Sequence, residues 1–164
     1  MPSKSSLTIE QVLTLLVQTP PRLATLTAGL GPAQLHTPPA EGEWSPNDIL
    51  AHLRACADVW GNCMTAIATR DRPVLRAVNP RTWIKKTDYR AQEIQPSLQA
   101  FTSQRAGLLA VIEPLAPADW SRVGIVTGAG KVLERTVLFY GRWLAVHERQ
   151  HIRQLERMAT PLHL

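Results

Sequence analysis

The chain has 164 residues, of which 45% are hydrophobic and 19% charged, and its net charge is +5. This length and composition fit one globular domain, residues 1–164, that folds without disulfides. No apolar run reaches the roughly 18 residues that cross a membrane, and the first residues do not resemble a secretory signal, so we expect a cytoplasmic protein with no membrane partner. The basic residues are scattered outside any nucleic-acid-binding motif, which argues against a nucleic-acid partner.

The first half of the chain predicts two long helices. Apolar residues recur at helical spacing over residues 8–30, where Pro20 and Pro21 predict a kink or a break because proline lacks an amide donor and clashes with the preceding turn. The second helix, residues 46–69, has the clearest start in the sequence. Ser45 is a good N-cap residue, and the proline that follows it suits the first helical position.

The second half predicts a long connection and two further helices. Residues 70–95 hold two prolines and many charges, with a short helix expected near residues 89–94. A third helix over residues 96–113 ends at prolines, a glycine-containing loop spans residues 126–131, and a fourth helix runs over residues 132–158.

Four amphipathic helices in one small domain predict an all-α four-helix bundle. The long connection between the second and third helices lets these two helices run parallel to each other. Residues 123–127 form the best strand candidate, and it is a weak one.

The most informative residues are three histidines on apolar helix faces. His147 and His151 lie four residues apart on the inward face of the fourth helix, where their imidazoles can share one cation. His52 occupies an inward position on the second helix. Burying three such rings is costly unless they are partnered, and a metal ion would take their lone pairs. Three histidines plus solvent form a common catalytic zinc site, although imidazole also suits nickel and iron. We therefore predict one divalent ion: Zn, Ni or Fe.

Other candidate residues have weaker signals. Taken alone, His52 on its apolar stripe is more often a satisfied core residue than a ligand, and the pair on the fourth helix is what favours a metal. We expect His36, in a proline-rich loop, and His163, near the end of the chain, to be solvated. Cys56 follows His52 by one turn and so has access to the metal, but a small buried hydrophobe is the better interpretation. An open metal site favours an anionic nucleophile, and basic side chains at its mouth would bind an anionic reactant. The candidates are Arg54, Arg105 and Arg149.

Residues 147–151 also spell H-E-x-x-H, the zinc-peptidase signature in which the glutamate acts as general base. Only 13 residues follow His151, and Gln154 and Arg157 replace the glycine and histidine of the extended pattern. A peptidase is therefore a minor alternative. Glu148 remains a candidate catalytic base or outer-shell partner, and a half-exposed surface charge is an equally good interpretation.

Two segments together resemble a known family. Residues 43–53, EWSPNDILAHL, and residues 147–155, HERQHIRQL, look like the DinB/YfiT-like superfamily of metalloenzymes. The resemblance implies a bundle in up-down-down-up order, often a homodimer, with a divalent metal on His52, His147 and His151. Some relatives are thiol S-transferases, which join a low-molecular-weight thiol to a small electrophile, and another is a hydrolase-like isomerase.

The resemblance leaves two classes of function open. The first is a metal-dependent enzyme, such as a thiol S-transferase or a related hydrolase or isomerase, that activates a thiol or a water. The second is a non-catalytic metal-binding stress or interaction protein. A closed structural site needs a fourth protein ligand, and no obvious carboxylate accompanies the three histidines in either helix, which favours an open site.

Overall fold

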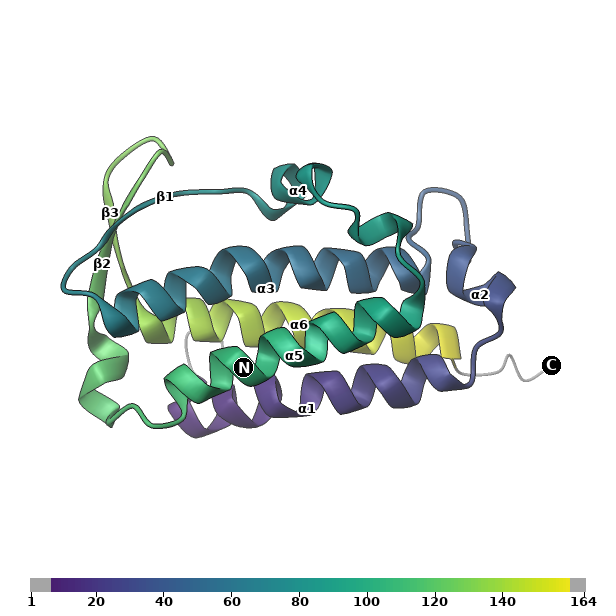
Figure 1. The fold of residues 1–164 in the computed structure, drawn as a ribbon, viewed down its shortest axis with the longest axis horizontal. Coiled ribbons are helices and arrows are strands. Elements are labelled where there is room, and N and C mark those ends of the chain that lie inside the picture. The colour runs from purple at the N-terminus through teal and green to yellow at the C-terminus, as the bar shows by residue number, and fades with distance from the viewer. Residues whose placement is uncertain (1–6, 160–164) are drawn as a thin grey trace.

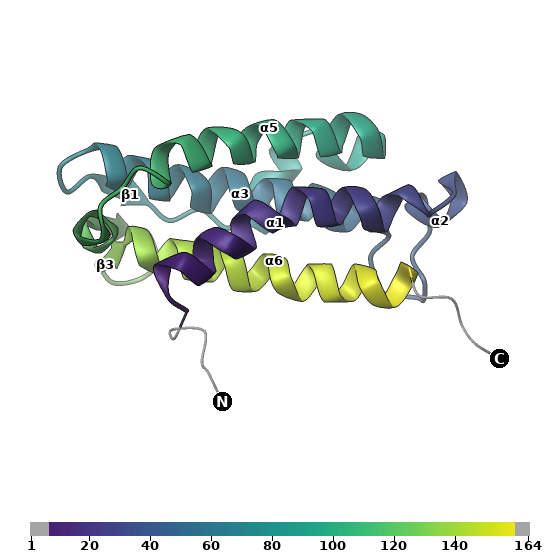
Figure 2. The same ribbon diagram turned by 90° about the horizontal axis from the view of Figure 1, so that it is seen from below.

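The computed structural model describes residues 7–159, and its four long helices lie side by side in a bundle (Figures 1 and 2). Around the bundle the order is α1, α6, α3 and α5, with each helix packed against two others. The chain runs along the bundle in one direction in α1, returns in both α3 and α5, and runs forward again in α6 (Figure 1). This is the predicted up-down-down-up order. The bounds are α1 Ile9–Ala28, α3 Pro46–Thr69, α5 Ile94–Ile112 and α6 Val137–Ala159.

Helix α1 continues through its two prolines, so the alternative of a break is wrong, although the helix axis bends part-way along (Figure 2). Pro20 cannot donate to the carbonyl of Leu16 four residues earlier. Arg105 of α5 supplies the missing donor, because its Nη1 lies 2.8 Å from Leu16 O. A side chain from a neighbouring helix thus satisfies a carbonyl that the sequence of α1 leaves without a partner. Between α1 and α3 lies the short helix α2 (Pro32–His36).

Helix α3 has the predicted bounds and the predicted cap. Ser45 Oγ accepts a hydrogen bond from the Asp48 amide at 3.1 Å, and Asp48 Oδ2 accepts one from the Ser45 amide at 3.3 Å. This reciprocal pair satisfies two amide donors at the start of the helix. Most of α3 is buried, because α5 and α6 pack along it and the connection that follows α3 also covers it.

The long connection after α3 runs along the outer face of that helix (Figure 1). The short helix expected near residues 89–94 is a single 3₁₀ turn, η3, and α5 starts two residues earlier than predicted. The connection returns the chain to the other end of the bundle, which is why α5 runs parallel to α3. Its elements are β1 Val74–Arg76, α4 Pro80–Trp83, η2 Ile84–Lys86 and η3 Tyr89–Ala91.

A small three-stranded sheet closes one end of the bundle (Figure 1). Strand β2 (Val123–Thr127), which follows the 3₁₀ turn η4 (Pro117–Ser121), pairs parallel to β1 and antiparallel to β3 (Leu133–Thr136). The weak strand prediction for residues 123–127 is therefore confirmed. The predicted start of the fourth helix at residue 132 is wrong, since α6 begins at Val137. Residues 133–136 satisfy their backbone groups against β2 instead.

None of the helices within residues 7–159 is long and apolar enough to cross a membrane.

Candidate metal centre

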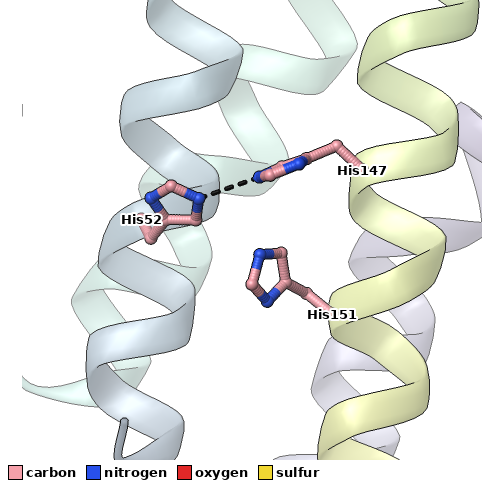
Figure 3. Close-up of side chains that lie close together, drawn as sticks. All are labelled: His52, His147 and His151. Carbon is pink, nitrogen blue, oxygen red and sulfur yellow. Dashed lines mark hydrogen bonds between the residues drawn. The ribbon is translucent and has the colours of Figure 1, made fainter. Parts of the chain in front are cut away.

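The antiparallel packing of α3 against α6 brings the three predicted histidines together (Figure 3). His52 of α3 faces His147 of α6, and their Nε2 atoms lie 2.8 Å apart. His151, one turn further along α6, has its ring centroid 5.1 Å from that of His52 and 4.8 Å from that of His147. One ligand atom from each ring lies within 4.8 Å of the others. The convergence predicted from the two helix faces is thus present in the structure.

This donor set fits a single divalent ion. Two imidazole nitrogens bound tetrahedrally at about 2.0–2.1 Å stand about 3.4 Å apart. On binding an ion, the Nε2 atoms of His52 and His147, now 2.8 Å apart, would move apart. Ligand atoms up to 4.8 Å apart would move closer together. Each change is about 1.5 Å or less, which small side-chain rotations can supply.

Neighbouring side chains fix the orientation of the rings. His151 Nδ1 lies 2.9 Å from Gln154 Oε1, and because an amide oxygen only accepts, Nδ1 carries the proton and Nε2 keeps its lone pair. The Trp44 ring stacks on His151 with centroids 5.9 Å apart, and the Trp60 ring meets His147 edge-on at 5.2 Å. Outer contacts of this kind set the tautomer and direction of a metal-ligating histidine.

The environment keeps His52 and His151 neutral. The pKa of His52 falls from its usual 6.5 to about 3, mainly because the ring is buried, and then because of His151, His147, Arg81 and Arg90. Burial is also the largest cause of the lowered pKa of His151, and Arg81 lowers it further. Neutral imidazoles have lone pairs available for a metal at ordinary pH.

The low pKa of His52 predicts a loss of stability in acid. The unfolded chain binds a proton at His52 below about pH 6.5, whereas the folded chain binds it only near pH 3. The contribution of His52 to the free energy of unfolding is therefore complete above pH 6.5 and declines as the pH falls towards 3. Denaturant titrations of metal-free protein between pH 4 and 7 should show a flatter pH dependence for His52→Gln than for wild type. The exposed His36 provides the control substitution, and an unchanged slope for His52→Gln would contradict the prediction.

Glu148 is fully buried, so the alternative interpretation of a half-exposed surface charge is wrong. Arg105 of α5 binds both of its oxygens: Nη1 lies 2.8 Å from Oε1, and Nη2 is paired with Oε2. The Thr19 hydroxyl of α1 lies 2.9 Å from Oε1. These contacts tie α6 to α5 and α1. Because both oxygens are engaged, the geometry favours a structural role for Glu148 over that of a general base.

The three arginines predicted to line the mouth of the site lie elsewhere. Arg105 is 2% exposed and pairs with Glu148. Arg54 is also buried; it donates to Gln92 at 2.7 Å and packs over a tyrosine ring. Arg149 lines a small cavity between α1 and α6. All three lie on helices, where packing decides which side chains reach the site.

A different set of basic residues lies beside the histidines. A cavity of about 340 Å³ contains His52 in its wall and is bounded by the connection between α3 and α5. Arg81, Lys85 and Arg90 line it. The sequence does show a cluster of cations over residues 81–90, but only the path of the connection across α3 places that cluster at His52. The other lining residues are Trp44, Thr82 and Ile84.

Cys56 lies beside His52 but is not one of the three clustered residues. Cys56 Sγ lies 3.5 Å from His52 Nε2, in a fully buried position. Burial is the largest cause of the raised pKa of its thiol, which favours the protonated form, and Cys56 lies outside the described group of three mutually close ligands. His36 is exposed, with Nε2 3.0 Å from a Glu93 carboxylate oxygen. His163 lies outside the described residues.

The fold and the histidine cluster define a class of protein: four-helix bundles in which three histidines from two antiparallel helices lie close together. A family model described as the DinB superfamily matches residues 15–155. The chain belongs to the DinB superfamily.

Three bacterial relatives are similar to this chain over most of its length. A relative from Geobacillus thermodenitrificans is 29% identical over 73% of this chain and 67% of its own length. A Bacillus licheniformis relative is 28% identical over 84% of this chain and 79% of its own, and a Geobacillus kaustophilus relative is 30% identical over 73% and 67%. All three are named "Putative metal-dependent hydrolase".

A solved structure, YfiT from Bacillus subtilis, has the same fold. Its TM-score is 0.77 at 18% identity, over 93% of this chain and 88% of YfiT. YfiT is described as a probable metal-dependent hydrolase with an unusual four-helix bundle topology. At this identity the likeness shows the fold alone.

Proposed function

We propose that this protein is a metal-dependent enzyme that activates a water or a thiol at one divalent ion held by His52, His147 and His151. The observation that carries the proposal is the convergence of three imidazoles from α3 and α6 on one point, within 4.8 Å of one another. A bound divalent ion would supply Lewis acidity, which lowers the pKa of a water or thiol that it ligates.

The neighbouring residues of the chain orient the three ligands and leave room for a reactant. Gln154 holds His151 in the tautomer with a free Nε2, and the Trp44 and Trp60 rings support the imidazoles. Three neutral ligands leave the positive charge of the ion uncompensated, which favours an anionic nucleophile. The cavity that reaches His52 gives a small molecule access to the cluster. With three protein ligands, one coordination position remains for a reactant, as in catalytic zinc sites.

Two reactions fit this arrangement, and different observations favour each. The names of the relatives favour hydrolysis, in which the nucleophile is water. The basic cavity beside His52 favours thiol transfer, because a low-molecular-weight thiol that carries carboxylates would be held there by Arg81 and Arg90. In thiol transfer the thiol sulfur forms a bond to an electrophilic carbon, whose leaving group departs with the bond's electron pair, and the thiol proton passes to solvent. The metal is Zn, Ni or Fe in this proposal.

The deciding experiment compares chelator-treated protein with protein reloaded with Zn, Ni or Fe. One arm follows hydrolysis of small esters and amides. The other follows the consumption of free cysteine, added as the thiol, in the presence of a halogenated aromatic electrophile. We expect a metal-dependent rate in one arm that is absent from His147→Ala. The arm that responds identifies the nucleophile.

If neither arm shows metal-dependent turnover while the protein retains about one ion per chain, the non-catalytic alternative, a metal-binding stress or interaction protein, replaces the enzyme. The homodimer also stays a prediction, and light scattering after size-exclusion chromatography would test it.

A further inference from the structure

The connection between α3 and α5 concentrates basic side chains at one cavity. Arg81 comes from α4, Lys85 from η2 and Arg90 from the 3₁₀ turn η3, and all three line the cavity of about 340 Å³ that also includes His52. These elements lie over the outer face of α3, where α4 is visible in Figure 1. Three short elements therefore present their cations to the same space.

The charges around this cavity are not balanced locally. No carboxylate is found among its described lining residues. The nearest carboxylate that the structure pairs with one of these cations is Asp48, whose Oδ1 lies 4.0 Å from Arg90 Nε. Asp48 is already engaged as the capping partner of Ser45 at the start of α3. Asp88, next to Arg90 in sequence, accepts a hydrogen bond from Gln92. An excess of positive charge therefore faces the cavity.

Both arginines are exposed, and each has a contact with the start of α3 or the residues before it. The guanidinium carbon of Arg81 lies 5.8 Å from the centroid of the Trp44 ring, which itself packs against His52 and His151. The backbone carbonyl of Arg90 accepts a hydrogen bond from the Asn47 amide at 3.3 Å, which ties η3 to α3. Arginine binds carboxylate and phosphate oxygens through paired N–H donors, so the two guanidinium groups supply the donors that such anions need.

The geometry points to an oxyanion-binding subsite formed by Arg81, Lys85 and Arg90, which holds a carboxylate or phosphate group of the substrate beside His52. That the anion is part of the substrate rests on the function proposed above, whereas the subsite itself does not. A cavity of this size lies at the small end of the range for small-molecule sites. The substrate class is therefore a small organic anion whose reacting group lies next to its carboxylate or phosphate.

The test measures binding of inorganic phosphate and of succinate to the full chain by isothermal titration calorimetry. Chelator-treated protein is used first, so that anion binding to a metal contributes nothing. We expect wild type to bind at least one of the two probes, and the tighter probe indicates whether the group is a phosphate or a carboxylate. Arg81→Gln should weaken binding about tenfold or more, as expected for loss of a charge-assisted hydrogen bond. Added chloride should weaken binding by wild type.

Matched variants separate a built subsite from the general positive charge of the chain. Lys85→Ala removes a cation from the cavity, and Lys131→Ala removes one from the exposed turn between β2 and β3. We expect only Lys85→Ala to weaken binding. Failure of wild type to bind either probe, or equal effects of the two lysine variants, would overturn the subsite.

The metal content of Arg81→Gln distinguishes the proposed metal-dependent enzyme from the proposed oxyanion-binding subsite. Retention of about one ion per chain together with lost anion binding supports both of them. A wild-type protein that binds anions but no metal would overturn the proposed function and leave the subsite standing.

Discussion

We expect His147→Ala to purify without the single divalent ion that wild type retains, as measured by elemental analysis after dialysis against metal-free buffer. His147 is the only residue whose Nε2 lies within 2.8 Å of His52 Nε2 among the described contacts, so its removal leaves two ligands instead of three. The expected loss of affinity exceeds the roughly 10- to 100-fold that loss of an outer-shell partner costs.

Two further variants serve as comparisons for the metal content of His147→Ala. His36→Ala removes an exposed histidine that is not part of the described cluster and should leave the metal content unchanged. Gln154→Ala removes the acceptor that orients His151 and should weaken metal binding by about 10- to 100-fold, without abolishing it. Equal metal content in wild type and His147→Ala would mean that the ion, if present, is held elsewhere.

The second large effect concerns stability. We expect Glu148→Ala to lower the free energy of unfolding by about 3–5 kcal/mol, because it leaves the guanidinium of Arg105 buried without its counter-charge. For a chain of this length such a loss lowers the melting temperature by roughly 10 °C. Thermal and urea denaturation followed by circular dichroism would measure both quantities.

Glu134→Ala is the matched control, because Glu134 pairs with Arg72 at 3.0 Å while both side chains are more than half exposed. An exposed ion pair of this kind contributes about 1 kcal/mol or less. Glu148→Gln retains the shape of the side chain and so tests the alternative role. A Glu148→Gln protein with wild-type stability but no activity would favour the general-base role implied by the H-E-x-x-H spacing. A destabilised protein with residual activity would favour the structural role.

Local signals in the sequence were sufficient for the bounds of α3 and for the three histidines that the structure brings together. The bounds of α3 follow from Ser45 and the proline after it, because capping depends on residues within one turn. Likewise, His147 and His151 share a face of α6 because residues four apart in a helix always do. The prediction that His52 joins them needed one further step: all three sit on apolar faces, and such faces meet in the core.

Long-range contacts decided the features that the sequence left open or misplaced. The apolar pattern of residues 133–136 suits a helix as well as a strand. They form a strand because β2 lies beside them and pairs with their backbone. Pro20 does not end α1, because Arg105, 89 residues after Leu16, reaches that residue's carbonyl. Spacing alone could not show that Glu148 points towards Arg105 and α1 and not towards solvent.

The sequence by itself determined the class of bundle and the identity of the three imidazoles, because caps, periodicity and helix faces are properties of neighbouring residues. Only the tertiary structure decided which cations surround the site. Arg54 of α3 and Arg105 of α5 are engaged in a hydrogen bond and an ion pair inside the bundle, whereas Arg81, Lys85 and Arg90 reach the cavity because their connection passes over α3 near His52. The path of a connection depends on what packs beneath it, and one-dimensional patterns do not contain that information.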